Sequence, residues 1–169
     1  MREVTEVAVG VLIDKEGRFL MASRPQGKPY AGWWEFPGGK LEAGEAVTEA
    51  LSREYAEELG IKVKKATPWF VFEREYPHAY VRLHFCRIVD WEGQPQPREG
   101  QTFQWFETLK QAQTEKLLPM CSLVIERLML SDRVALVKTP LSPTVETDFE
   151  KSGAKAILAS SFTPEKRAL

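Results

Sequence analysis

The segment from Glu45 to Leu59 constrains the fold most, because it contains neither glycine nor proline and consists mainly of Ala, Leu and Glu. Such a run predicts an α-helix, and Gly60 follows it at the place where glycine commonly ends a helix. At about 100° per residue, a single arc about 120° wide collects apolar and acidic side chains together. These residues are Val47, Ala50, Leu51, Glu54, Glu57 and Glu58. The face that packs against the rest of the molecule is therefore also expected to carry three carboxylates.

Three carboxylates at spacings of three and four residues repel one another, and partial burial raises that cost. A positive partner is therefore expected beside them. Arg53, on the same helix, can pair with one of the acids. A divalent cation can neutralise all three, and because no His or Cys stands nearby, an all-oxygen site suits Mg²⁺ or Mn²⁺ rather than Zn²⁺. A solvated acidic helix end explains the same spacing equally well.

The rest of the pattern is that of one mixed α/β domain. Strand-like runs rich in Val, Ile and aromatic residues are expected at 5–13, 18–23, 63–76, 80–91 and 102–106. The turn signal at 14–17 predicts that the first two strands form a β-hairpin, and a second helix is expected at 117–130. Glycine and proline cluster in two loops, at 24–32 and 93–100. This order of elements predicts a sheet covered by helices on both faces.

Charge and cysteine content exclude several classes of protein. The formal net charge is −1, which provides no field to hold polymeric nucleic acid or an anionic membrane. No apolar run approaches the roughly 20 residues needed to span a bilayer, and residues 1–14 do not read as a signal peptide. Cys86 and Cys121 are too few for a disulfide framework or a zinc site. We therefore expect a cytoplasmic protein with reduced thiols.

The C-terminal part differs in composition from the rest. Residues 139–153 have the composition of a linker, residues 133–138 could form a strand, and residues 154–158 are a short apolar segment. We therefore expect a single domain over residues 1–132, followed by a partly flexible extension over residues 133–169.

The loop before the first predicted helix and the helix itself match a known pattern. Gly39, Glu45 and the run Arg53-Glu-Tyr-Ala-Glu-Glu-Leu-Gly-Ile61 resemble the Nudix box, G-x5-E-x7-R-E-U-x-E-E-x-G-U, where U is a bulky apolar residue. Every fixed charged or glycine position is filled. Tyr55 occupies a position that is usually aliphatic, and we expect it to alter packing rather than chemistry.

The resemblance extends over about residues 4–130, in the order of segments seen in the MutT-like branch of that family. It implies an α/β/α sandwich around a mixed β-sheet. It also implies hydrolysis of oxidised guanine nucleoside triphosphates, chiefly 8-oxo-dGTP, to the monophosphate and pyrophosphate. Such an enzyme cleans the nucleotide pool before DNA replication and so avoids mutation. The expected partner is a small-molecule nucleotide, and the expected state is a monomer, with a dimer as the alternative.

The resemblance also implies roles for individual residues, with Mg²⁺ as cofactor and Mn²⁺ as an alternative. The metal ligands it implies are the carbonyl of Gly39 and the side chains of Glu54, Glu57, Glu58 and Glu99. The catalytic residues it implies are Arg53, Glu54, Glu57 and Glu99. Arg53 would orient Glu54 through a charge-assisted pair. Either Glu54 or Glu99 would deprotonate the attacking water, and the sequence does not separate the two.

The chain departs from the MutT-like pattern at positions expected to recognise the substrate. The substrate-binding residues it suggests are Arg24, Phe36, Gly38, Lys40, Tyr76 and Cys121. Where the branch has an asparagine that reads the oxidised purine, this chain has Cys121 or Ser122, and a thiol offers neither a good donor nor a good acceptor. Where the branch has an arginine between the long strands, this chain has Ala79.

These departures keep two alternatives open. One is a Nudix hydrolase of another nucleoside diphosphate linked to a moiety X. The other is a Nudix module that binds nucleotides without turnover, although the intact glutamates of the box argue against it.

Overall fold

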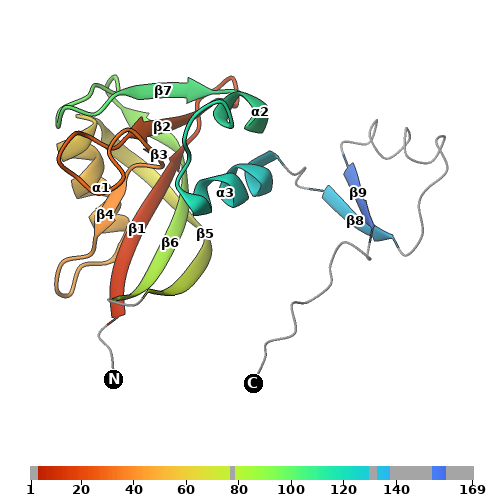
Figure 1. Cartoon of the computed structure of the whole chain (residues 1–169), viewed down its shortest axis with the longest axis horizontal. Coiled ribbons are helices and arrows are strands. Elements are labelled where there is room, and N and C mark those ends of the chain that lie inside the picture. Colours follow the sequence, from red (N-terminus) through yellow and green to blue (C-terminus); the bar gives the residue numbers. More distant parts are fainter. Residues whose placement is uncertain (1–3, 77–78, 130–132, 138–153, 159–169) are drawn as a thin grey trace. The chain divides into compact units, whose positions relative to one another are not determined.

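The computed structural model of the chain describes residues 4–76, 79–129, 133–137 and 154–158 (Figure 1). It separates into two compact units, Met1–Ser122 and Leu123–Leu169. The expected mixed α/β architecture is confirmed, and the strands of the first unit form two sheets rather than one.

The larger sheet has four strands in the order β4-β1-β6-β5. Their bounds are Val4–Leu12 for β1, Gly38–Lys40 for β4, Lys62–Tyr76 for β5 and Ala79–Glu92 for β6. β1 runs parallel to β6, with Val7 opposite Leu83, and antiparallel to β4, with Ala8 opposite Gly39. The sheet is therefore mixed, and the two glycines expected in a loop belong to its edge strand.

The smaller sheet has the order β3-β2-β7, with β2 at Phe19–Ser23, β3 at Trp34–Glu35 and β7 at Phe103–Phe106. The expected hairpin between the first two strands is wrong: β1 and β2 belong to different sheets, and the chain between them pairs at the isolated bridge between Ile13 and Phe19. The turn itself is present, because the Asp14 carboxylate accepts hydrogen bonds from the backbone of Glu16 and Arg18, at 3.1 and 2.8 Å. The strands then diverge because β4 and β6 occupy both edges of β1.

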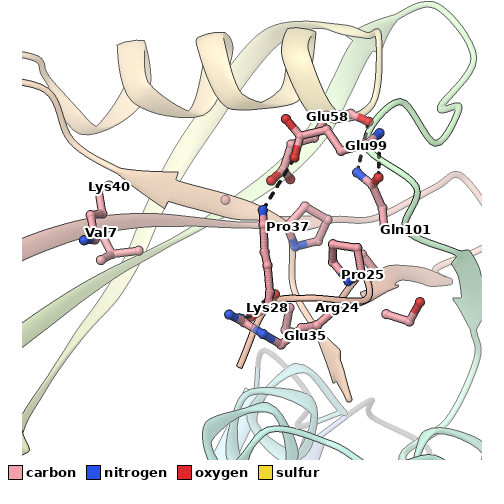
Figure 2. Close-up of a pocket in the computed structure, with 13 residues that line it drawn as sticks. Val7, Arg24, Pro25, Lys28, Glu35, Pro37, Lys40, Glu58, Glu99 and Gln101 are labelled. Carbon is pink, nitrogen blue, oxygen red and sulfur yellow. Dashed lines mark hydrogen bonds and ion pairs between the residues drawn. The ribbon is translucent and has the colours of Figure 1, made fainter. Parts of the chain in front are cut away.

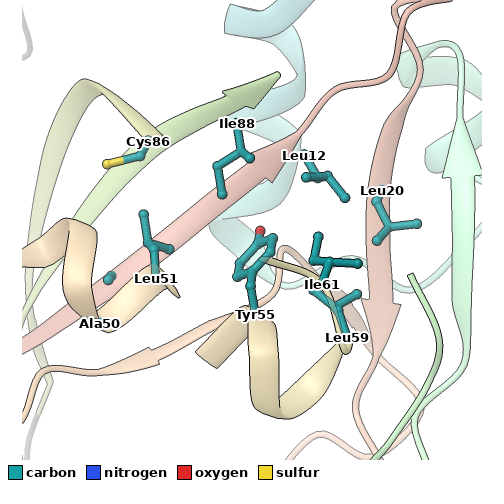
Figure 3. Packing of buried hydrophobic residues seen from close by; sticks show 10 residues of the cluster. Leu12, Leu20, Ala50, Leu51, Tyr55, Leu59, Ile61, Cys86 and Ile88 are labelled. Atoms are coloured by element: carbon teal, nitrogen blue, oxygen red, sulfur yellow. The ribbon is translucent and has the colours of Figure 1, made fainter. Parts of the chain in front are cut away.

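Helix α1 covers Val47–Glu58, within the range expected from the sequence. Its apolar side packs into a cluster of buried residues that reaches β1, β2 and β6 (Figure 3). A short helix, α2, at Leu109–Ala112 was not expected, and Thr108 caps it by accepting a hydrogen bond from the backbone of Gln111. Helix α3 covers Pro119–Met129 and begins at the proline, where the missing N–H costs nothing.

Tyr55 lies at the centre of the buried cluster (Figure 3). Its side chain is fully buried, and its hydroxyl donates a 2.6 Å hydrogen bond to the carbonyl oxygen of Gly10 on β1. A Cβ at Gly10 would overlap the tyrosine ring and hydroxyl. The aromatic residue at this position therefore changes the packing, as expected, and requires a glycine on the strand opposite.

In the second unit, β8 at Arg133–Val137 pairs in parallel with β9 at Ala154–Leu158. Both lie where the sequence showed apolar segments. The linker expected at 139–153 and the residue that would end the first domain, Asp132, lie outside the described residues. No helix in the described part of the chain is long and apolar enough to cross a membrane.

Candidate functional site

A cavity of about 340 Å³ opens in the first unit, where the end of α1, the edge strand β4 and two loops meet (Figure 2). It is lined by Val7, Ala22, Ser23, Arg24, Pro25, Lys28, Glu35, Pro37, Gly38, Lys40, Glu58, Glu99 and Gln101. Five of the residues singled out in the sequence are among them: Arg24, Gly38, Lys40, Glu58 and Glu99. The cavity therefore brings together residues from distant parts of the sequence.

Beside the cavity, Arg53 connects the N-terminal and C-terminal ends of the box. Its guanidinium donates to both oxygens of Glu45, at 2.9 and 2.8 Å, and to Glu54 at 2.8 Å. It also donates to the carbonyl of Lys40 at 3.1 Å. The hydrogen bonds from Arg53 lower the pKa of Glu45 to about 2, and these carboxylates raise the pKa of Arg53 above its usual range. The pair between Arg53 and Glu54 is the contact that the resemblance implies.

Glu54 also lies against the backbone of β4. A Cβ at Gly39 would overlap the Glu54 carboxylate, so a residue with any side chain would push the two apart. The side chain of Glu54 is only 15% exposed, whereas that of Glu57 is 58% exposed and lies 3.6 Å from Arg53. Glycine at position 39 thus allows a helix carboxylate to approach the backbone of β4 closely.

The opposite side of the site is formed by Glu58, Glu99 and Gln101 (Figure 2). The buried Gln101 side chain donates to the carbonyl of Glu58 at 3.3 Å and accepts from the backbone of Glu99 at 2.7 Å. It thereby joins the loop at 93–102 to the end of α1. Sequence reasoning did not find Gln101, since an isolated glutamine carries no signal of such a bridge.

Negative charge accumulates on this side. Burial, followed by the charges of Glu54, Glu99 and Glu35, raises the pKa of Glu58 to about 7. Lys28 lowers that pKa in part, and its ammonium lies 3.7 Å from the Glu99 carboxylate. An added cation here would relieve the repulsion and favour the ionised form of Glu58.

Arg24 is paired with a residue that sequence reasoning missed. Its Nη1 donates to both oxygens of Glu35, at 2.8 and 2.6 Å, and its Nε donates to the carbonyl of Pro29 at 2.7 Å. Burial raises the pKa of Glu35, and Arg24 opposes that rise. Glu35 is half-buried and lies between the buried residues Trp34 and Phe36, and no motif in the sequence pointed to it.

Two of the expected substrate-binding residues do not line the cavity. Phe36 is buried, with its ring 6.0 Å from that of Phe19. Cys121 is also buried, and burial raises the pKa of its thiol to about 12, so it is a neutral thiol at physiological pH. Tyr76 ends β5, but its side chain lies outside the described residues.

The donors present suit a hard divalent cation. The nearby side chains are carboxylates, and the excess of negative charge at Glu58 is what a cation would relieve. Among the residues that the structure describes, no three acidic, His or Cys side chains converge into a ready ligand set. The acidic side chains are divided between two places: Glu54 and Glu57 contact Arg53, whereas Glu58 and Glu99 line the cavity.

Comparison with known proteins identifies the family to which this chain is similar. The family model of the NUDIX domain matches residues 4–121. An 8-oxo-dGTP diphosphatase of Haemophilus influenzae is 37% identical over 106 residues, which are 63% of this chain and 78% of the relative. A CTP pyrophosphohydrolase of Escherichia coli is 37% identical over 97 residues, which are 57% of this chain and 72% of the relative.

A solved structure has a similar fold. It comes from work on MutT of Aliivibrio salmonicida and Vibrio cholerae, and it is 27% identical with a TM-score of 0.65. The match covers 75% of this chain and 98% of that one.

Proposed function

The chain belongs to the Nudix family, and from that premise we propose that it is a Mg²⁺-dependent nucleoside triphosphate pyrophosphohydrolase. Its proposed substrate is an oxidised purine nucleotide such as 8-oxo-dGTP, which it would hydrolyse to the monophosphate and pyrophosphate. This activity would remove damaged nucleotides before DNA synthesis. The similarity to 8-oxo-dGTP diphosphatases supports the substrate class.

The observation that carries the proposal is the set of contacts around Arg53. Arg53 hydrogen-bonds Glu54 and Glu45, and Glu54 lies against Gly39 at the edge of the cavity. Glu54, Glu57, Glu58, Glu99 and the carbonyl of Gly39 would hold Mg²⁺. When bound, the ion would neutralise phosphoryl oxygens and lower the pKa of a water molecule.

The protein's own groups would do the rest. Glu54 or Glu99 would accept the proton of the attacking water. Arg53 would orient Glu54, since it donates a charge-assisted hydrogen bond to it. Arg24, Gly38 and Lys40 line the cavity and would contact the nucleotide. Phe36, Cys121 and Tyr76 remain candidates for contact with the base, the first two from buried positions.

A pyrimidine nucleotide is the second candidate substrate. Cys121 or Ser122 stands where the MutT-like branch has a purine-reading asparagine, and the neutral, buried Cys121 thiol cannot replace an amide as donor and acceptor. The similarity to a CTP pyrophosphohydrolase supports this alternative, because that relative and the 8-oxo-dGTP diphosphatase of Haemophilus influenzae are both 37% identical to this chain over the aligned residues.

We further propose that residues 1–132 form the catalytic domain, that residues 133–169 are an extension, and that the protein acts as a monomer in the cytoplasm.

The test is release of pyrophosphate with Mg²⁺ from 8-oxo-dGTP, dGTP, dATP, dCTP, dTTP and CTP. We expect 8-oxo-dGTP to have the highest kcat/KM and Glu57→Gln to abolish turnover. A preference for CTP or dCTP would move the assignment to the second candidate. No release from any of the six would contradict the pyrophosphohydrolase and favour another nucleoside diphosphate derivative.

A further inference from the structure

We propose that Lys28 binds the triphosphate of the substrate, exchanging its present partner, Glu99, for a phosphoryl oxygen. The inference rests on the proposed function, because it assigns a phosphate contact within the same cavity. None of the sequence patterns pointed to Lys28, which lies in a loop outside the Nudix box.

The position of the Lys28 ammonium is the first observation. Figure 2 shows its side chain extending from the loop across the cavity toward Glu99, and Nζ lies 3.7 Å from the Glu99 Oε2 atom. That distance is an ion pair but exceeds the range of a hydrogen bond. Both side chains are about half exposed, at 55% for Lys28 and 45% for Glu99. Such a pair contributes little and is easily exchanged for a stronger acceptor.

The loop that carries Lys28 is itself well ordered by local contacts. Arg24, at its start, donates to the carbonyl of Pro29 and receives a backbone hydrogen bond from Gly32 at its end, at 2.7 and 2.9 Å. The aromatic ring of Tyr30 lies 5.5 Å from that of Trp33. The loop therefore presents Lys28 at the cavity at a small further cost in entropy.

Tyr30 adds a second sign of a constrained loop. Its φ of 61° lies in the left-handed region, which a residue with a bulky side chain rarely adopts. Backbone conformations of this kind persist only where surrounding contacts impose them, and they cluster at ligand sites. Here the contacts on either side of Tyr30 are the Arg24 hydrogen bond to the carbonyl of Pro29 and the Trp33 backbone hydrogen bond to the carbonyl of Tyr30, at 2.7 and 3.0 Å.

Of the three cations that line the cavity, Lys28 has the weakest partner next to the acidic side of the site. Arg24 is held by both oxygens of the Glu35 carboxylate, whereas Lys28 has the weaker, longer partner. Lys40 is the third cation lining the cavity, and Figure 2 shows it at the opposite end from Glu99. Lys28 is therefore the cation best placed to bind an anion next to Glu58 and Glu99.

Binding of two nucleotides by calorimetry, in buffer with Mg²⁺, tests the inference. The probes are the non-hydrolysable α,β-methylene dGTP and the monophosphate dGMP. We expect Lys28→Met to weaken binding of the triphosphate about 10-fold, equivalent to about 1.4 kcal/mol, and to leave dGMP within about twofold. Lys28→Arg should retain most of the affinity because it keeps the charge. Lys15→Met, an exposed lysine in a remote turn, serves as the matched control.

A purely structural role is tested in a Glu99→Gln background. If Lys28 serves only to neutralise Glu99, the loss caused by Lys28→Met disappears once that carboxylate is removed. If Lys28 contacts phosphate, the roughly 10-fold loss persists there. Equal weakening of both nucleotides, or no weakening, would overturn the inference. Selective weakening without turnover by the wild type would leave it standing while contradicting the pyrophosphohydrolase.

Discussion

The two sides of the site differ in how their charges are balanced. On the side of Arg53, one guanidinium contacts Glu45 and Glu54 by short hydrogen bonds, and the pKa of Glu45 falls to about 2. On the side of Glu58, burial and then the charges of neighbouring carboxylates raise the pKa of Glu58 to about 7. Glu45 and Glu54 already have a cationic hydrogen-bond partner, whereas an entering cation would favour the ionised form of Glu58. Arg53 therefore orients the carboxylates on one side of the site, and the other side gains most from binding a cation.

Removing the charge of Glu54 tests whether the side of the site that contains Arg53 takes part in catalysis. We expect Glu54→Gln to lower kcat about 10²- to 10³-fold, because it removes the negative charge of a candidate metal ligand and of the partner of Arg53. Pyrophosphate release from the preferred nucleotide measures the effect. Glu49→Gln, in the first turn of the same helix, should leave kcat unchanged, since glutamine can still accept the bond from Ala46. A loss of less than tenfold in Glu54→Gln would contradict the assignment.

Replacing Arg53 by lysine tests the importance of its geometry. An ammonium cannot span Glu45 and Glu54 as the planar guanidinium does. We expect Arg53→Lys to reduce kcat about 10- to 100-fold and to raise the Mg²⁺ concentration needed for half-maximal rate. Arg18→Lys is the matched control, because Arg18 pairs with Asp14 away from the cavity. Equal rates in the two variants would show that charge alone suffices at position 53.

The pKa of Glu58 predicts how the stability of the metal-free protein depends on pH. Because this pKa is raised from 4.5 to about 7 on folding, the native state binds more protons than the unfolded state in that window. The free energy of unfolding should therefore fall as the pH rises from 4.5 to above 7. We expect Glu58→Gln to remove this fall and to be more stable than the wild type at pH 8 by about 2 kcal/mol, allowing for solvent screening.

Urea denaturation with a chelator, at pH 5 and at pH 8, measures the difference. Glu75→Gln, an exposed acid on β5, is the control and should follow the wild type. Added Mg²⁺ should restore stability at pH 8 in the wild type more than in Glu58→Gln. A wild-type stability that rises over the same pH interval, with Glu58→Gln no more stable at pH 8, would contradict the charge imbalance.

The smallest expected effect concerns the residue that connects the helix to the sheet. Tyr55→Phe removes the hydrogen bond to Gly10 and leaves a buried carbonyl without it, at a cost of about 1–2 kcal/mol in the free energy of unfolding. The ring still fills its space, so both sides of the site should keep their positions and KM should not change. Chemical denaturation and steady-state kinetics check the two parts. A changed KM would show that the hydroxyl also sets the site geometry.

Features set by neighbours in the sequence could be predicted, and features set by distant contacts could not. The helix with Arg53 and Glu54 was predictable, because the spacing of charges along one helix follows from its periodicity. The link between Arg24 and Glu35 was missed, since it depends on the pairing of β2 with β3. The predicted hairpin was wrong for the same reason. The partners of β1 are β4 and β6, and their pairing with β1 depends on contacts far along the chain.

The contact between Tyr55 and Gly10 has an evolutionary consequence. The space that Gly10 leaves empty is filled by the tyrosine ring, so any larger residue at position 10 requires a smaller one at position 55. The two positions should therefore vary together among relatives of this chain, with a residue larger than glycine at position 10 accompanied by an aliphatic residue smaller than tyrosine at position 55. Either exchange alone passes through a destabilised intermediate. A lineage that acquired this tyrosine in its Nudix box is thus expected to keep it.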